Sequence, residues 1–246
     1  VVVDKNKLAL DPECTKCRAS VRAKGVVVKA FKGDGAELNA TEVTLLGKCP
    51  PEYPIQKKRT TLDFLRGIPH LRLRTNTFTA VFRVRSVAAQ AVHRYFHERG
   101  YYYIHTPLIT ASDCEGAGEM FRVTTQPWNA KYESEEAYFA DDFFGKKAGL
   151  SVSGQLEGEV AATALGRIYT FGPSFRAENS NTTKHLAEFW HIEPEIAFAE
   201  LPDVLEVAEE MVKYLIRAVL TECPAEIDFF DKFVQKGLRD KLTHVA

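Results

Sequence analysis

The sequence has no long apolar run and almost no net charge. No stretch reaches the roughly 20 consecutive apolar residues that a membrane-spanning helix needs, so a membrane protein is not predicted. The formal net charge of −1 argues against a generally basic surface that binds nucleic acid through charge alone. Apolar residues make up 45% and charged residues 26% of the 246 residues, which suffices for one large domain or two smaller ones.

Cysteine is scarce, and its pattern fits neither of the usual cysteine frameworks. The five cysteines are odd in number and irregularly spaced, which favours a reducing compartment over a disulfide-bonded secreted domain. Cys14 and Cys17 form a lone C-x-x-C motif, whereas a structural zinc site needs four ligands and no second pair follows. We therefore predict no metal site in these residues and a cytoplasmic location, with an organelle also compatible.

The order of residue patterns predicts an α+β protein with three parts. Residues 1–48 hold three stretches rich in β-branched residues (1–3, 21–31 and 40–46, with a turn at 33–35), which predict part of a β-barrel. A proline-rich segment begins a linker over residues 49–76, and residues 77–246 form the larger domain. Helices are expected over residues 61–66, 77–99, 155–165, 203–221 and beyond 224, strands over 101–109, 150–153 and from 167 onwards, and an insertion or long loop over 126–145. Asp203 is expected to cap its helix, with Glu206 completing a capping box.

The most informative segment is residues 174–195, which predicts two strands joined by a polar loop. Because side chains alternate along a strand, Arg176 and Glu178 share one face, and Phe189, His191 and Glu193 share a face of the return strand. The opposite face is apolar. Arginine can bind a phosphate with a planar fork of donors, an aromatic ring can stack on a base, and a carboxylate can accept from an amino group. The mixture indicates a nucleotide-binding surface; the alternative is a hairpin with a solvated charged face.

Motifs in order along the chain resemble those of class II aminoacyl-tRNA synthetases. Pro107, after an apolar helix and strand, resembles motif 1, and Phe175-Arg176-Ala177-Glu178 with Phe189 resembles motif 2. Within the class, residues 106–121, 152–156 and 175–182 are similar to the asparaginyl-tRNA synthetases. The resemblance covers about residues 50–225. It implies an antiparallel catalytic sheet flanked by helices, preceded by a partial OB-fold that would bind the anticodon.

The resemblance also implies a two-step ligase reaction. Asparagine and ATP would form asparaginyl-adenylate, and the acyl group would then pass to the terminal adenosine of asparagine tRNA, with Mg²⁺ beside ATP. By similarity, Arg176 holds the α-phosphate, where it would stabilise charge in the transition state, and Phe189 stacks on the adenine. Glu178 would lie near the adenylate or the tRNA end, as the second catalytic residue beside Arg176. His185 would reach the outer phosphates of ATP; its alternative is an exposed loop histidine.

The same resemblance implies an amino-acid pocket. Glu115 and Gln155 resemble the residues that hold the substrate ammonium, and Ser153 would assist them. Glu193 would accept from the carboxamide of asparagine and, if buried, repel aspartate; the alternative is a strand-end acid in solvent. At Gly158 we expect a lysine in the aspartate enzymes, where it would neutralise the substrate carboxylate.

The chain departs from the family pattern at both ends. Nothing after Ala225 resembles motif 3, which would supply a second ATP-binding arginine, and the Mg²⁺ ligands are expected in that missing part. The early barrel strands with their anticodon-reading aromatics are also not recognisable. We therefore expect an interior portion of a synthetase that forms a homodimer through Pro107. Adenylate formation by this chain alone is expected to be impaired.

Three other functions remain open at this point. An aspartyl-tRNA synthetase and a tRNA-independent asparagine synthetase-like enzyme use the same scaffold, although barrel strands before Pro50 argue against the latter. A non-catalytic tRNA-binding paralogue would have no chemical need for the intact Arg176, Glu178, Phe189 and Gln155.

Overall fold

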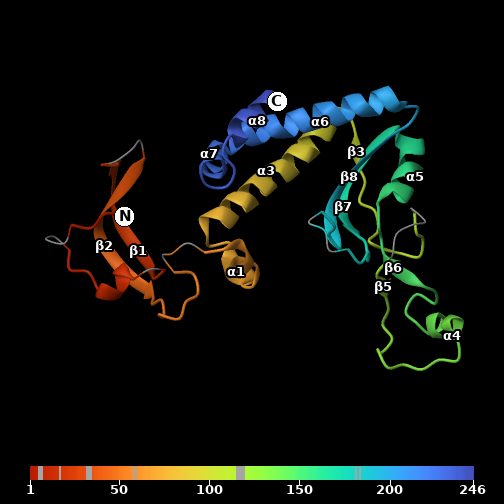
Figure 1. Cartoon of the computed structure of the whole chain (residues 1–246), viewed down its shortest axis with the longest axis horizontal. Coiled ribbons are helices and arrows are strands. Elements are labelled where there is room, and N and C mark those ends of the chain that lie inside the picture. The colour runs from red at the N-terminus through yellow and green to blue at the C-terminus, as the bar shows by residue number, and fades with distance from the viewer. Residues whose placement is uncertain are drawn as a thin grey trace. The chain divides into compact units, whose positions relative to one another are not determined.

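The chain forms two compact units, Val1–Thr79 and Ala80–Ala246 (Figure 1). The computed structural model describes residues 1–4, 8–16, 18–31, 35–56, 58, 60–114, 120–180, 182 and 184–246. Among these residues no helix combines the length and the apolar character that crossing a membrane requires. Cys17 of the C-x-x-C motif and most of the turn expected at residues 33–35 lie outside the described residues.

The first unit is built on a long antiparallel pair, β1 (Ser20–Lys29) and β2 (Ala36–Gly47). The register shifts beside Gly25, where a Cβ would come within 2.0 Å of the Asn39 carbonyl oxygen, so the backbones approach too closely for a side chain. The strand expected at residues 1–3 is wrong as an element, because Val2 forms only a single parallel bridge, to Asn39. The 3₁₀ helix η1 (Pro12–Thr15) and the helices α1 (Leu62–Arg66) and α2 (Pro69–Arg72) complete the unit.

The second unit is built around a three-stranded sheet in the order β3-β7-β8. Its strands are β3 (Tyr102–Tyr103), β7 (Arg167–Phe175) and β8 (Glu188–Ile196). β3 runs parallel to β7, and β7 pairs with β8 in an antiparallel register that sets Thr170 opposite Glu193 and Gly172 opposite His191. A smaller antiparallel sheet has the order β4-β6-β5, formed by β4 (Ile109–Thr110), β6 (Ala148–Leu150) and β5 (Arg122–Val123).

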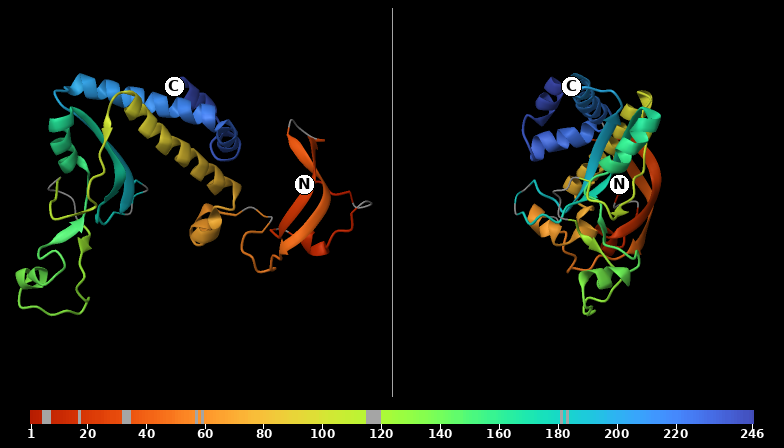
Figure 2. Two further views of the ribbon diagram at one scale, coloured as in Figure 1. Left: turned by 180° about the vertical axis from the view of Figure 1, so that it is seen from behind. Right: turned by 90° about the vertical axis from the view of Figure 1, so that its right-hand side faces the viewer.

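Helices cover both faces of the larger sheet (Figures 1 and 2). α3 (Asn76–Glu98) and α6 (Leu201–Glu222) pack on one face, where Phe96 stacks on Tyr169 with ring centroids 4.4 Å apart. α5 (Gln155–Leu165) lies against the other face. Gly158 lies at this contact, where an added Cβ would make ordinary van der Waals contacts at 3.4 Å with Ile168 and Glu195. The aromatic cluster under α3 therefore fixes the sheet whose opposite face carries polar side chains.

The structure corrects several expected elements. The strand expected over residues 101–109 is two short pieces in different sheets, since the proline at 107 cannot donate to a ladder. The strand expected over 150–153 ends at Leu150, and the expected insertion contains a helix, α4 (Glu135–Ala140). α6 begins at Leu201, so Asp203 is not its cap: its carboxylate instead accepts from the backbone N–H of Glu200 at 2.8 Å. The expected terminal helices are confirmed as α7 (Pro224–Phe233) and α8 (Leu238–Val245).

Candidate functional site

Arg176 and Phe189 lie together at the end of the β7–β8 hairpin where a loop joins the two strands. The guanidinium carbon of Arg176 is 5.4 Å from the centroid of the Phe189 ring, so the two side chains share a face as expected. The prediction that Arg176 and Glu178 lie on the strand itself is wrong, because β7 ends at Phe175. Arg176 nevertheless keeps one ladder-like bond, from its N–H to the Ala187 carbonyl at 3.1 Å, which fixes its direction just beyond the strand.

These two side chains line a hollow of about 350 Å³, a size within the range of small-molecule sites. Its other lining residues are Glu178, Lys184, His185 and Leu186. His185 Nε2 lies 3.8 Å from a Glu178 carboxylate oxygen, and the His185 side chain is half exposed. The hollow thus combines an aromatic ring, cationic groups and one carboxylate, which suits a phosphorylated nucleotide. Lys184 was missed from the sequence; its place in the polar loop beside His185 was the available signal.

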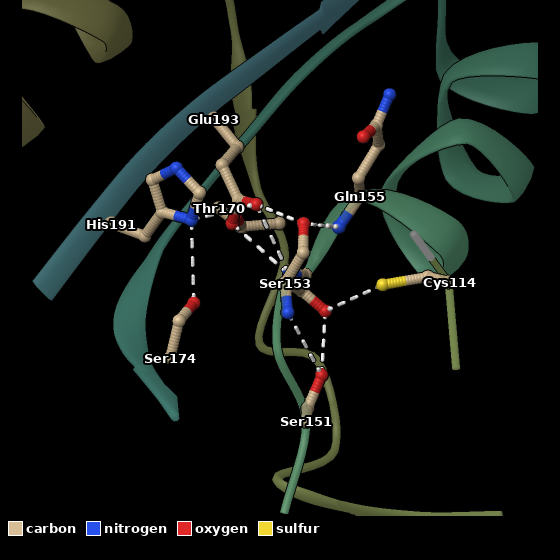
Figure 3. Close-up of polar contacts among 9 residues, drawn as sticks. Cys114, Ser151, Ser153, Gln155, Thr170, Ser174, His191 and Glu193 are labelled. Atoms are coloured by element: carbon tan, nitrogen blue, oxygen red, sulfur yellow. Dashed lines mark hydrogen bonds and ion pairs between the residues drawn. The ribbon is translucent and has the colours of Figure 1, made fainter. Parts of the chain in front are cut away.

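A second polar cluster surrounds Glu193, further along the same face of β8 (Figure 3). Its carboxylate accepts hydrogen bonds from the hydroxyls of Ser153 and Thr170, the latter at 2.7 Å, and from the backbone N–H of Gly154 at 3.1 Å. His191 Nδ1 lies 3.1 Å from the same carboxylate. The Glu193 side chain is only 10% exposed, so the reading as a solvated strand-end acid is wrong.

The hydrogen bonds decide the ionisation of Glu193. Burial alone would raise the pKa of this carboxyl, but the bonds from His191, Ser153 and Thr170 outweigh burial and lower the pKa to about 2. Glu193 is therefore ionised at neutral pH. The neighbouring Glu195 differs, since burial and the charges of Glu159 and Glu193 raise its pKa.

The start of α5 is built into this cluster. Ser153 Oγ accepts from the N–H of Gln155 at 3.1 Å, while its hydroxyl hydrogen goes to Glu193. A Cβ at Gly154 would meet hydroxyl oxygens of Thr106 and Thr170 at 2.9 Å and the Glu193 carboxylate at 3.1 Å. The turn therefore accepts only glycine without displacing the groups that hold Glu193.

The remaining expected site residues are placed differently. The side-chain amide of Gln155 donates to Glu159 at 3.0 Å and points away from the Glu193 cluster (Figure 3). Glu115 lies outside the described residues, and Pro107 is exposed. The sequence analysis missed Thr170 and Ser174. Both lie on one face of β7, because side chains an even number of residues apart on a strand point the same way, and this two-residue alternation could have identified them.

The described residues do not provide a magnesium site. Among them no group of three or more histidine, cysteine, aspartate or glutamate side chains could hold a metal ion. The metal expected beside ATP is therefore not assigned to any residue of the described ranges.

Comparisons with known proteins agree with this geometry. The family model described as class II tRNA synthetases (D, K and N) matches residues 63–244. Asparagine–tRNA ligases of Clostridium perfringens (strain SM101 / Type A) and Parabacteroides distasonis are 53% and 52% identical; each match covers 100% of this chain and 54% or 53% of the relative. The crystal structure of asparaginyl-tRNA synthetase from Pyrococcus horikoshii complexed with asparaginyl-adenylate matches with a TM-score of 0.78 and 28% identity, covering 97% of this chain and 52% of that one. The chain spans about half the length of the curated relatives it matches.

Proposed function

Because the chain belongs to the class II tRNA synthetases of the D, K and N group, we propose that the whole protein is an asparagine–tRNA ligase. The amino-acid carboxylate would attack the α-phosphorus of ATP and release pyrophosphate. The terminal hydroxyl of tRNA would then attack the acyl carbon of the adenylate and release AMP. Relatives named asparagine–tRNA ligase, at 53% identity over the whole chain, support this choice of amino acid.

The observation that carries the proposal is the order of side chains along one face of β8. Phe189 and Glu193 are four residues apart, which is about 14 Å at roughly 3.4 Å per residue. That separation suits an aminoacyl-adenylate, whose base and amino acid lie at opposite ends. Phe189 would carry the adenine, and the Glu193 end would carry the asparagine.

The nucleotide end would work mainly through charge. Arg176 would bind the α-phosphate and stabilise the negative charge that develops there during adenylate formation. His185 and Lys184 would face the outer phosphates that leave as pyrophosphate. Glu178, which lines the same hollow, would lie near the adenylate or the tRNA end.

The amino-acid end would bind the substrate ammonium through Gln155 and Glu115, with Ser153 and Glu193 forming the pocket wall. An ionised Glu193 disfavours an aspartate side chain, because two carboxylates would meet in a partly buried site. Among the described residues, the lining of the small pocket beside Glu193 contains no lysine or arginine that would neutralise an aspartate side chain. This charge pattern favours asparagine over the aspartyl-tRNA synthetase alternative.

The partners follow from the same proposal. The protein would use ATP and Mg²⁺, act on asparagine tRNA, form a homodimer through the Pro107 region and work in the cytoplasm, where the tRNA is charged. The first unit, with its β1–β2 pair, would belong to an anticodon-binding domain.

Thermal-shift titration tests the proposal, since a ligand stabilises the folded state that it binds. Asparagine with ATP should raise the midpoint of unfolding, and aspartate with ATP should raise it less. An equal or larger shift with aspartate would identify an aspartate enzyme, and no shift with either amino acid or with ATP would contradict the ligase proposal.

A further inference from the structure

Thr182 lies in the loop between β7 and β8 and contacts two basic residues of the nucleotide hollow. Its hydroxyl oxygen Oγ1 lies 2.5 Å from Nδ1 of His185. The same oxygen accepts a hydrogen bond from the backbone N–H of Lys184 at 3.3 Å. His185 and Lys184 line the hollow, and the described lining residues do not include Thr182. The hydroxyl therefore supports the site from outside the hollow.

The contact with Lys184 closes a short turn in the loop. A bond from a threonine hydroxyl to the N–H two residues further on is a common way of building such a turn. It sets the direction of the backbone at Lys184, and the ring of the next residue, His185, then folds back onto the same hydroxyl. One side chain thus connects the turn to the His185 ring, in a loop where Thr182 and Lys184 are otherwise exposed.

The two ring nitrogens of His185 have different surroundings. Nδ1 contacts Thr182, whereas Nε2 lies 3.8 Å from a carboxylate oxygen of Glu178, which is longer than a hydrogen bond. Nε2 is therefore the nitrogen that a ligand in the hollow can contact. The hydroxyl suits either charge state of the ring, because it can donate to a bare Nδ1 or accept from a protonated one.

Holding the ring before a ligand arrives favours binding. The His185 side chain is half exposed, and an exposed side chain without such a contact moves among several rotamers. Ordering it when a ligand binds would cost free energy, and a side chain that is already held avoids that cost. The contact with Thr182 reaches His185 without occupying Nε2.

We propose that Thr182 is a positioning residue for ATP, which holds His185 so that Nε2 reaches the outer phosphates. The inference rests on the proposed function and adds a residue to its nucleotide end. Thr182 does not touch the nucleotide and acts through His185. Binding of ATP therefore depends on the Thr182 hydroxyl, whereas binding of AMP, which has only the α-phosphate, does not.

The test compares ATP with AMP in calorimetric titrations of the whole protein. Thr182→Val keeps the shape of the side chain and removes the hydroxyl, so ATP should bind about fivefold to tenfold more weakly, the effect of one lost hydrogen bond. The affinity for AMP should not change. Thr182→Ser retains a hydroxyl and should bind both nucleotides as the unaltered protein does. Thr163→Val is the matched control on α5, where the lost hydroxyl donates only to the Val160 carbonyl, and it should change neither affinity.

A double substitution tests whether Thr182 acts through His185. His185→Ala should itself weaken ATP binding and leave AMP binding unchanged. In a protein that already carries His185→Ala, Thr182→Val should cause no further loss, because the ring that the hydroxyl holds is absent. Losses of ATP affinity that simply add would overturn the positioning role.

The outcomes separate this inference from the function on which it depends. If the unaltered whole protein shows no asparagine-dependent pyrophosphate exchange, the ligase proposal fails and the inference fails with it. If exchange is present but Thr182→Val binds ATP as before, or weakens ATP and AMP equally, only the role of Thr182 is overturned. The thermal midpoint of each variant shows whether a loss of binding reflects unfolding, and the ratio of the two affinities is unaffected by a uniform loss of folded protein.

Discussion

Replacing Gly154 by alanine tests whether the turn before α5 is as closely packed as the structure indicates. The added Cβ would lie 2.9 Å from hydroxyl oxygens of Thr106 and Thr170 and 3.1 Å from the Glu193 carboxylate. Each of these atoms would have to move, and two of them belong to the hydrogen bond between Thr170 and Glu193. Overpacking of this kind typically costs about 1–3 kcal/mol, and a strained hydrogen bond adds about 1 kcal/mol.

The opposing effect is smaller. Alanine restricts the unfolded chain, which stabilises a compatible site by about 0.4–1 kcal/mol. We therefore expect Gly154→Ala to lower the free energy of unfolding by about 1–3 kcal/mol, measured by urea denaturation. Gly172→Ala is the matched control, because a Cβ there meets nothing within 4 Å in the same sheet. It should be neutral or slightly stabilising; equal effects of the two substitutions would refute the packing argument.

Three further expectations concern Glu193, Phe189 and the start of α6. Because the pKa of Glu193 is lowered to about 2 from 4.5, its contribution is complete above pH 4.5 and lost as the pH falls towards 2. That contribution is on the order of 3 kcal/mol, so urea unfolding should lose less stability between pH 5 and pH 3 in Glu193→Gln than in the unaltered chain, and identical losses would disprove the assignment. Phe189→Ala should weaken ATP binding by about 1–3 kcal/mol in calorimetry, while an unchanged affinity would remove the ring from the adenine site. Asp203→Ala should destabilise the chain by about 0.5–2 kcal/mol, because the carboxylate that accepts from the Glu200 N–H is lost. An unchanged thermal midpoint of unfolding would contradict this expectation.

The sequence was a good guide where a strong local period decides the structure. The helix expected over residues 155–165 is α5 with the same bounds, and the helix expected over 77–99 differs from α3 by one residue at each end. Strand alternation placed Arg176 and Phe189 on one face, which the contact between guanidinium and ring confirms. Local sequence patterns gave wrong element boundaries where contacts with distant parts of the chain set them. Examples are the N-cap of α6 and the strand interrupted by Pro107.

The cluster around Glu193 could not be predicted in detail, because its members are far apart in the chain. Ser153 is 40 residues from Glu193, and Thr170 reaches it only through the antiparallel register of β7 and β8. The acid itself was expected in a pocket; its four internal donors depend on how α5 meets the sheet.

The most direct test of the proposed function is a crystal structure of the whole protein with the sulfamoyl analogue of asparaginyl-adenylate bound. The adenine should lie on the Phe189 ring, the sulfamoyl group at Arg176, and the carboxamide beside the Ser153–Glu193 cluster. A ligand bound on another surface, or an adenine placed away from Phe189, would contradict it.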